Sequence, residues 1–288
     1  MKHHLFAFLF TLLTICTPST YAQVKPIENS LLWEISGNGL SKPSYLFGTF
    51  HILCPDNFAI AENVKTALSK TDRITFEVNI ADPDFVPSIQ KAMMSDVPLS
   101  KKLSPQQFRA LDSVMVELKS PYTLKQMDNL SLQAVSSMLI QKILPCETPV
   151  SFEGELLKIA QEHHKPAAGL ETVEFQMECL RNAFSDEHLY QQILKIQKTD
   201  ADLKAMISLY QQQNLNGIYS YVMKKEGMAA ESEKWMMEVR NKNWVAAMPV
   251  MMEKESNLFA VGAGHLGGKY SLITMLREKG FSVKPIYK

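Results

Sequence analysis

Two histidines in this sequence follow short apolar runs at the same distance from a glycine. Residues 45–47 lead into Gly48 and then His51, and residues 258–261 lead into Gly262 and then His265. An apolar run of this length predicts a buried strand, and open sheets bind ligands beyond the carboxyl ends of their strands. A glycine at that point allows the backbone to turn or to approach a ligand closely. A single such histidine is more often a hydrogen-bonding loop residue, so the prediction of one shared site depends on the pair.

Two glutamates occupy comparable positions. Glu77 lies inside residues 73–80, where β-branched or aromatic residues alternate with polar ones. A carboxylate buried in a strand is costly unless it is paired, protonated or bound to metal, although an edge strand with Glu77 facing water is an equally good interpretation. Glu171 follows the strand-like residues 166–170 where a helix begins near Thr172. An acid there also suits the free amides of a helix start, so both interpretations stay open.

The elements expected around these residues alternate between strands and helices. Residues 31–35 and 44–47 flank Gly-Asn-Gly, which predicts a hairpin whose second strand leads to His51. Capping and amphipathic patterns predict helices over 61–69, most of 83–143, 151–164, one long helix over 186–213, more helix ending near Trp244, and 270–279. A last strand is expected over 282–286. This order predicts an α/β (or α+β) fold with a mixed sheet flanked by helices and a largely helical insertion, or cap, over about 83–254.

The first residues predict export. A basic start at Lys2 precedes an apolar run over 5–16 and small residues up to Ala22, so residues 1–22 are expected to be a secretory signal peptide. Residues 23–288 then form a single domain in the periplasm or outside the cell. Cys16 would fit a lipoprotein signal, but the bulky Ile15 before it argues against lipidation. No later stretch approaches the roughly 18 apolar residues of a membrane span.

The charge balance argues against some binding partners, and the cysteine content limits the number of disulfides. The chain has 30 basic and 30 acidic residues, so it has no net field to attract nucleic acid or anionic lipid. Removal of the signal leaves Cys54, Cys146 and Cys179, which allow at most one intramolecular disulfide. We favour a Cys54–Cys146 bridge over three buried thiols, because Cys54 lies three residues after His51 and the bridge would hold that loop.

With these pieces placed, the sequence resembles the TraB/GumN family, which includes the Tiki metalloproteases. The resemblance spans nearly the whole mature chain and is carried by five segments: Leu32-Trp33-Glu34-Ile35 with residues 45–51, Phe76-Glu77, Gly169-Leu170-Glu171-Thr172 with Gln176, Arg240-Asn241 with Trp244, and Gly262-Ala263-Gly264-His265. It implies a fold like that of the erythromycin esterase and ChaN-like (EreA/ChaN-like) group.

The resemblance also implies roles for single residues. His51, Glu77 and His265 would be the metal ligands, with Gly48 and Gly262 as the loop glycines. Imidazole and carboxylate ligands suit Mn, Co or Zn, and a bound metal lowers the pKa of a water that can attack a carbonyl. Arg240 would stabilise the developing oxyanion, and Glu171 is a second candidate for ligand or general base alongside Glu77.

These inferences predict an exported metal-dependent hydrolase, a Tiki-like metallopeptidase that acts on a peptide or protein and forms a homodimer. The sequence lacks His-Glu-x-x-His, Gly-x-Ser-x-Gly and Cys-x-x-Cys, which argues against common zinc proteases, serine hydrolases and redox exchangers. The alternative is a non-catalytic protein that binds metal, haem or a peptide.

Overall fold

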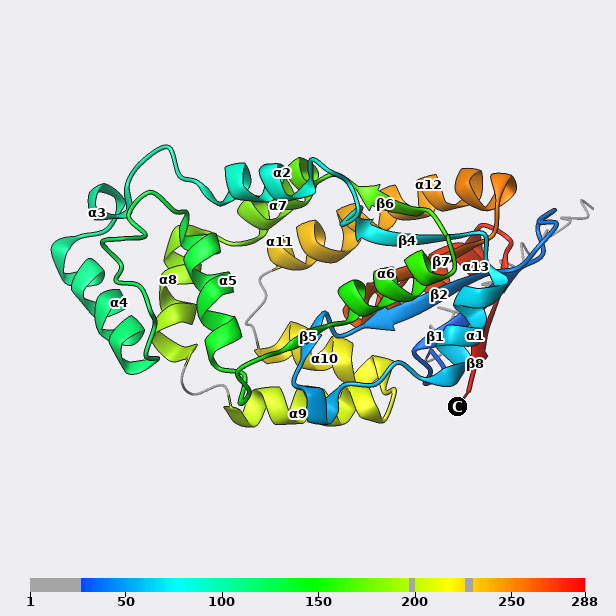
Figure 1. Ribbon diagram of the computed structural model, residues 1–288, viewed down its shortest axis with the longest axis horizontal. Helices are drawn as coiled ribbons and strands as arrows, with labels where there is room; N and C mark the ends of the chain where they lie inside the picture. The colour runs from blue at the N-terminus through cyan, green and yellow to red at the C-terminus, as the bar shows by residue number, and fades with distance from the viewer. Residues whose placement is uncertain (1–26, 197–199, 226–229, 288) are drawn as a thin grey trace, which may run out of the picture.

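A computed structural model describes residues 27–196, 200–225 and 230–287. The predicted signal peptide, residues 1–22, lies outside these ranges. A six-stranded sheet has the order β6-β4-β7-β2-β1-β8 (Figure 1). Its strands are β1 (Leu32–Ser36), β2 (Ser44–Thr49), β4 (Arg73–Val78), β6 (Ala167–Glu171), β7 (Asn257–Gly262) and β8 (Ser282–Ile286).

The sheet is mixed, as predicted. Strands β6, β4, β7 and β2 run parallel, whereas β1 pairs antiparallel with both β2 and β8. The hairpin prediction is confirmed by the pairing of β1 with β2. Every residue of β2 and β7 is buried, which explains why these strands read as continuous apolar runs rather than alternating ones. The carboxyl ends of the four parallel strands therefore lie together at one edge.

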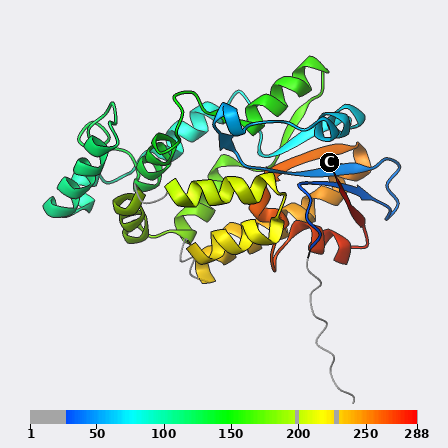
Figure 2. The same ribbon diagram turned by 90° about the horizontal axis from the view of Figure 1, so that it is seen from below.

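Helices cover both faces of the sheet (Figure 2). On one side lie α1 (Glu62–Lys70) and α6 (Phe152–Glu162), which contact β7 and β4. On the other side lie α12 (Arg240–Lys254) and α13 (Leu272–Glu278), which contact each other and the strands β6 and β8 respectively. The fold class predicted from the sequence is confirmed by this arrangement.

The helical insertion extends away from the carboxyl edge of the sheet (Figure 1). Its helices are α2 (Phe85–Met93), α3 (Leu99–Lys102), α4 (Pro105–Glu117), α5 (Leu132–Lys142), α7 (Val173–Ala183), α8 (Asp186–Lys195), α9 (Asp200–Gln211), α10 (Leu215–Lys225) and α11 (Ala230–Glu233), followed by a π-helix over Lys234–Val239. Ser104 caps α4 with the expected capping box. Leu111, Val135, Leu139 and Ile193 belong to a second hydrophobic cluster, separate from the cluster around the sheet.

Two helix predictions were wrong in extent. Residues 186–213 form two helices, since α8 ends at Lys195 and α9 begins at Asp200. Ile193 of α8 is buried in the insertion's cluster, whereas Tyr210 of α9 is buried in the sheet's cluster. The helix expected to end near Trp244 continues to Lys254 through Pro249. Burial of Trp244, Met248 and Met252 at helical spacing supports this continuation.

A disulfide joins the loop after His51 to the insertion. Cys54 and Cys146 are bridged with their Cα atoms 5.7 Å apart, as predicted, and Cys179 is free and buried. Beside the bridge, the short strand β3 (Ile52–Leu53) pairs antiparallel with β5 (Val150–Ser151), and a 3₁₀ helix covers Pro55–Asn57. Both links hold the segment that carries His51.

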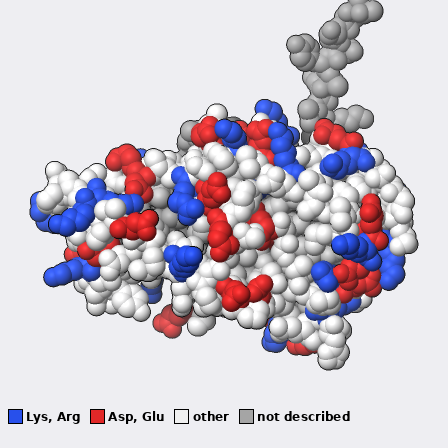
Figure 3. Space-filling model, turned by 90° about the horizontal axis from the view of Figure 1, so that it is seen from above, with Lys and Arg blue, Asp and Glu red and all other residues white. Residues whose placement is uncertain are grey.

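The described part of the chain contains no helix long and apolar enough to cross a membrane. Figure 3 shows basic and acidic side chains interspersed on one face, with apolar and uncharged surface between them.

Candidate functional site

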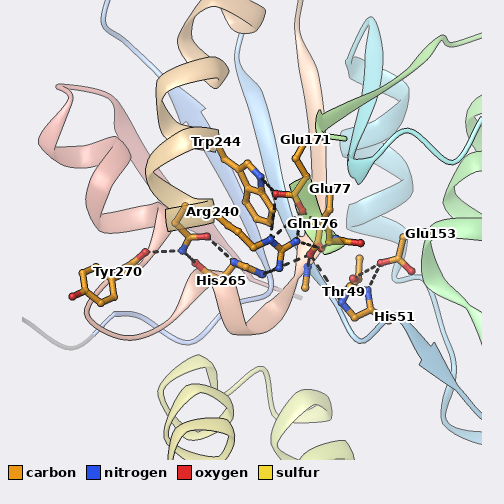
Figure 4. Close-up of polar contacts among 12 residues, drawn as sticks. Thr49, His51, Glu77, Glu153, Glu171, Gln176, Arg240, Trp244, His265 and Tyr270 are labelled. Carbon is orange, nitrogen blue, oxygen red and sulfur yellow. Dashed lines mark hydrogen bonds and ion pairs between the residues drawn. The ribbon is translucent and has the colours of Figure 1, made fainter. Parts of the chain in front are cut away.

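The carboxyl edge of the sheet brings the two predicted histidines and Glu77 together (Figure 4). His51 follows β2, Glu77 is the second-last residue of β4, and His265 lies in a 3₁₀ helix, Ala263–Leu266, after β7. Because β7 lies between β4 and β2, these three positions meet. Nε2 of His51 is 4.0 Å and Nε2 of His265 is 3.8 Å from Oε1 of Glu77. The convergence expected from the paired motifs is therefore present.

The two motif glycines allow this close approach. A Cβ atom on Gly262 would lie 2.9 Å from Nε2 of His51 and 3.3 Å from Oε1 of Glu77. The Gly262 N–H also donates to Oε1 of Glu77 at 2.7 Å. A Cβ atom on Gly48 would lie 3.1 Å from Ala263, where the loop after β7 crosses β2. At both positions the requirement is space rather than an unusual backbone angle.

His51 is held in a strained backbone conformation by a residue that the sequence analysis did not identify. Its φ of 60° is in the left-handed region, which non-glycine residues rarely adopt. Its Nδ1 lies 2.9 Å from Oε1 of Glu153, which also accepts a hydrogen bond from Thr49 Oγ1 at 2.6 Å. The surrounding protein opposes the charge of the imidazole, although 56% of the side chain is exposed, but the Glu153 hydrogen bond and the Glu77 carboxylate raise the pKa of His51 to about 9.

Glu153 could not be recognised in the sequence because its position looks ordinary. It lies in the first turn of α6, two residues after the capping residue Ser151. Acids are common there, since they favour the positive end of the helix dipole. Glu153 contacts His51 because α6 packs beside the loop that carries His51, and the local sequence gives no sign of this packing.

Arg240 is the centre of a buried ion-pair network. Its side chain is 3% exposed, and Nη2 donates to Oε2 of Glu77 at 2.7 Å and to Oε1 of Glu171 at 2.6 Å. Nε donates to the same Glu171 oxygen at 3.0 Å. The interpretation of Glu77 as a solvated edge-strand residue is thus wrong, because β4 lies between β6 and β7. Burial opposes the charge of Glu77, but Arg240 and both histidines hold its pKa well below the usual range.

Glu171 faces Arg240 rather than the free amides of α7. The N-cap of that helix is Thr172, whose side chain accepts from the Phe175 N–H. Oε2 of Glu171 accepts from Trp244 Nε1 at 2.8 Å. Gln176 Nε2 donates to both glutamates, at 3.1 Å to Glu171 and 3.2 Å to Glu77. Burial raises the pKa of Glu171 despite the opposing effect of Arg240. This geometry makes Glu171 the anchor of the guanidinium.

His265 is fixed in one tautomer. Asn241 Nδ2 donates to the carbonyls of His265 and Tyr270, which turns its Oδ1 toward His265 Nδ1 at 2.6 Å. Nδ1 therefore carries the proton, and Nε2 has the one lone pair of the ring. Burial and the adjacent Arg240 lower the pKa of His265 to about 3. Arg240 Nη1 lies 3.2 Å from Nε2 and donates to it.

The start of α12 positions three of these side chains. The π-helix over Lys234–Val239 ends directly before Arg240, and such turns often occur at functional sites. The first, second and fifth residues of α12 face the site; they are Arg240, Asn241 and Trp244. The Trp244 ring packs 4.7 Å from the Arg240 guanidinium and 4.5 Å from the His265 ring.

Comparison with known proteins agrees with this arrangement. The model of the TraB/PrgY/gumN family matches residues 31–285. This chain belongs to the TraB/PrgY/gumN family. The match includes every candidate residue from His51 to His265, and the family resemblance read from the sequence is confirmed. No curated protein and no solved structure matches the chain.

The side chains at the site of this TraB/PrgY/gumN member are of the kinds that bind divalent metal ions. Two imidazole Nε2 atoms lie near one carboxylate oxygen of Glu77. Glu153 and Asn241 hydrogen-bond the opposite ring nitrogens, as carboxylates and carbonyls commonly do for metal-bound histidines. Ligands about 2.1 Å from an ion lie roughly 3–3.5 Å apart, so the separations of 3.8 and 4.0 Å are about half an ångström too wide. Accordingly, no group of His, Cys, Asp or Glu within the described ranges already forms a metal site.

Proposed function

We propose that this protein is an exported metal-dependent hydrolase that cleaves peptide bonds. The single observation that supports this most is that Nε2 of His51 and Nε2 of His265 face the same Glu77 oxygen. The first 22 residues support export, and the Cys54–Cys146 bridge suits an oxidising compartment.

Each side chain of the site has a separate role in the proposed reaction. His51, Glu77 and His265 would hold Mn, Co or Zn, which supplies a water of lowered pKa when bound. Glu153 and Asn241 orient the two imidazoles so that each presents Nε2. Arg240 Nη1 lies 3.2 Å from His265 Nε2, so once a metal takes that lone pair the Nη1 N–H can stabilise negative charge on a carbonyl oxygen. Glu171 holds the guanidinium in that orientation.

One observation favours a second function, binding of a peptide or haem without cleavage. Arg240 already donates to the Nε2 lone pair of His265 that a metal would need. While Arg240 holds this lone pair, His265 cannot serve as the third metal ligand, and the site cannot activate water.

Metal content and peptide cleavage distinguish these functions. The wild type, purified without chelator and dialysed against Mn²⁺, Co²⁺ or Zn²⁺, should hold one ion per chain and cleave members of a peptide library. His51→Ala and His265→Ala should lose both properties. His164→Ala is a matched control, because His164 also has positive φ, 54°, but is exposed at the end of α6.

Unchanged metal content in both site variants would disprove the hydrolase proposal. A Soret band on addition of haemin, without cleavage under any of the three metals, would support the binding function instead.

A further inference from the structure

A large cleft lies among the helices of the insertion and reaches the residue before His51. Its volume is about 850 Å³, and its walls come from α5, α8, α9 and α10 together with Phe50. Clefts that bind small ligands have volumes of about 300–1,000 Å³, so this one is large enough for several side chains of a bound molecule.

Two links connect the cleft to the candidate site. Phe50 lines the cleft and directly precedes His51. Helix α10, which contributes Val222 to the wall, packs against the 3₁₀ helix that carries His265. A molecule in the cleft would therefore contact the segment that carries His51 and a helix that packs against the loop of His265.

The wall of the cleft is mostly apolar. Phe50, Ile140, Phe184, Leu203 and Met206 are among its lining residues. One lysine and one aspartate add a charge of each sign, so the wall does not select a charged ligand. Apolar walls favour ligands whose own aliphatic or aromatic groups become buried on binding.

Two buried polar atoms in the wall lack partners within the described residues. They are Oε1 of Gln133 and Nε2 of His188, whose ring stacks on Phe184 at 5.3 Å. Buried polar groups are nearly always hydrogen-bonded, so atoms of this kind mark places where a ligand can bind. An amide oxygen accepts a peptide N–H, and an imidazole nitrogen accepts from an N–H or donates to a carbonyl, depending on its tautomer. A peptide backbone offers both groups.

We propose that this cleft binds an apolar segment of a peptide substrate beside the bond to be cleaved. The inference rests on the proposed function for the position of the bond, but binding itself requires no catalysis. The apolar side chains of the substrate pack against α5, α8 and α9, and its backbone reaches Gln133 and His188.

Binding is tested with two N-dansylated heptapeptides, one of Leu, Val and Phe and one of Ser, Thr and Gln, by fluorescence anisotropy. The full chain should bind the apolar peptide at least about tenfold more tightly, because each buried aliphatic side chain contributes about tenfold or more. Ile140→Lys and Leu203→Glu should each weaken this binding about tenfold or more. Ile140 is 52% exposed and Leu203 is half-buried, so both variants should fold.

Val116→Lys is the matched control, since Val116 is 70% exposed on α4 and does not line the cleft. Equal affinity for the two peptides, or unchanged affinity in both cleft variants, would overturn the inference. The His265→Ala variant separates the two proposals: it should lose cleavage and still prefer the apolar peptide. If the wild type cleaves nothing but binds as expected, only the hydrolase proposal fails.

Discussion

Replacement of Arg240 by methionine should reveal how much the buried ion pairs contribute to stability. Arg240 is 3% exposed and pairs with Glu77 and Glu171 at 2.7 and 2.6 Å. Methionine fills a similar volume but leaves two buried carboxylates whose remaining donors come from Gly262, Gln176 and Trp244. Loss of one partner from a buried ion pair costs about 3–5 kcal/mol, so we expect a fall of this size in the free energy of unfolding at pH 7.5.

The deficit should shrink in acid. In the wild type, Arg240 holds the pKa of Glu77 below its usual 4.5, so this stabilisation is present above pH 4.5 and is lost as pH falls through the lower folded value. In Arg240→Met, burial raises the pKa of both carboxyls, which penalises folding at pH 7.5 but not below about pH 4.5, where both the folded and unfolded carboxyls hold protons.

Urea unfolding at pH 7.5 and pH 5, followed by tryptophan fluorescence, measures this. A second substitution, Glu171→Gln, should recover part of the loss because it removes one uncompensated charge. The reasoning is refuted if the deficit is the same at both pH values and Glu171→Gln makes the variant less stable still.

Three further predictions concern the groups around His51. The double substitution Cys54→Ser and Cys146→Ser removes a cross-link across 92 residues, and loop-closure entropy predicts a fall of about 4.5 kcal/mol in the free energy of unfolding. A fall below about 1 kcal/mol in urea unfolding would contradict the role of the bridge as a constraint. Glu153→Gln should weaken Mn²⁺ binding about 10- to 100-fold by isothermal titration, whereas Glu162→Gln, exposed at the end of α6, should leave it unchanged. Gly262→Ala should displace Nε2 of His51 by about half an ångström and lower kcat/KM about 100-fold with little loss of stability, and equal kcat/KM would show that the close approach is unimportant.

The sequence predicted those parts of the structure that depend on local pattern. Apolar runs ending in glycine located β2 and β7 and thereby placed His51 and His265 at one edge. Serine caps located the starts of α4 and α6. The bridge between Cys54 and Cys146 followed from the position of one cysteine after His51. For the strands and the helix starts, the signal lay within a few residues of the feature.

Features that depend on packing between distant segments were not predictable. The apolar residues of α8 and α9 belong to different hydrophobic clusters. An amphipathic pattern predicts a helix with a buried face but not the surface against which that face packs. Glu153 resembles any acid at a helix start until α6 lies beside the His51 loop. Arg240 was found through the family resemblance, because a single arginine in a helix carries no signal of its burial.

The two histidines differ in their freedom to move, and this determines how an ion would enter if the proposed function holds. The His265 side chain is 6% exposed and is bound by Asn241 and Arg240, whereas the His51 side chain is 56% exposed. The half-ångström contraction that a metal requires should therefore come from the side chain of His51, because the disulfide and the β3–β5 pairing hold its strained backbone in place. Addition of Zn²⁺ should consequently shift the ring NMR signals of His51 more than the backbone signals of residues 263–266. Larger changes at residues 263–266 would assign the movement to the loop after β7 instead.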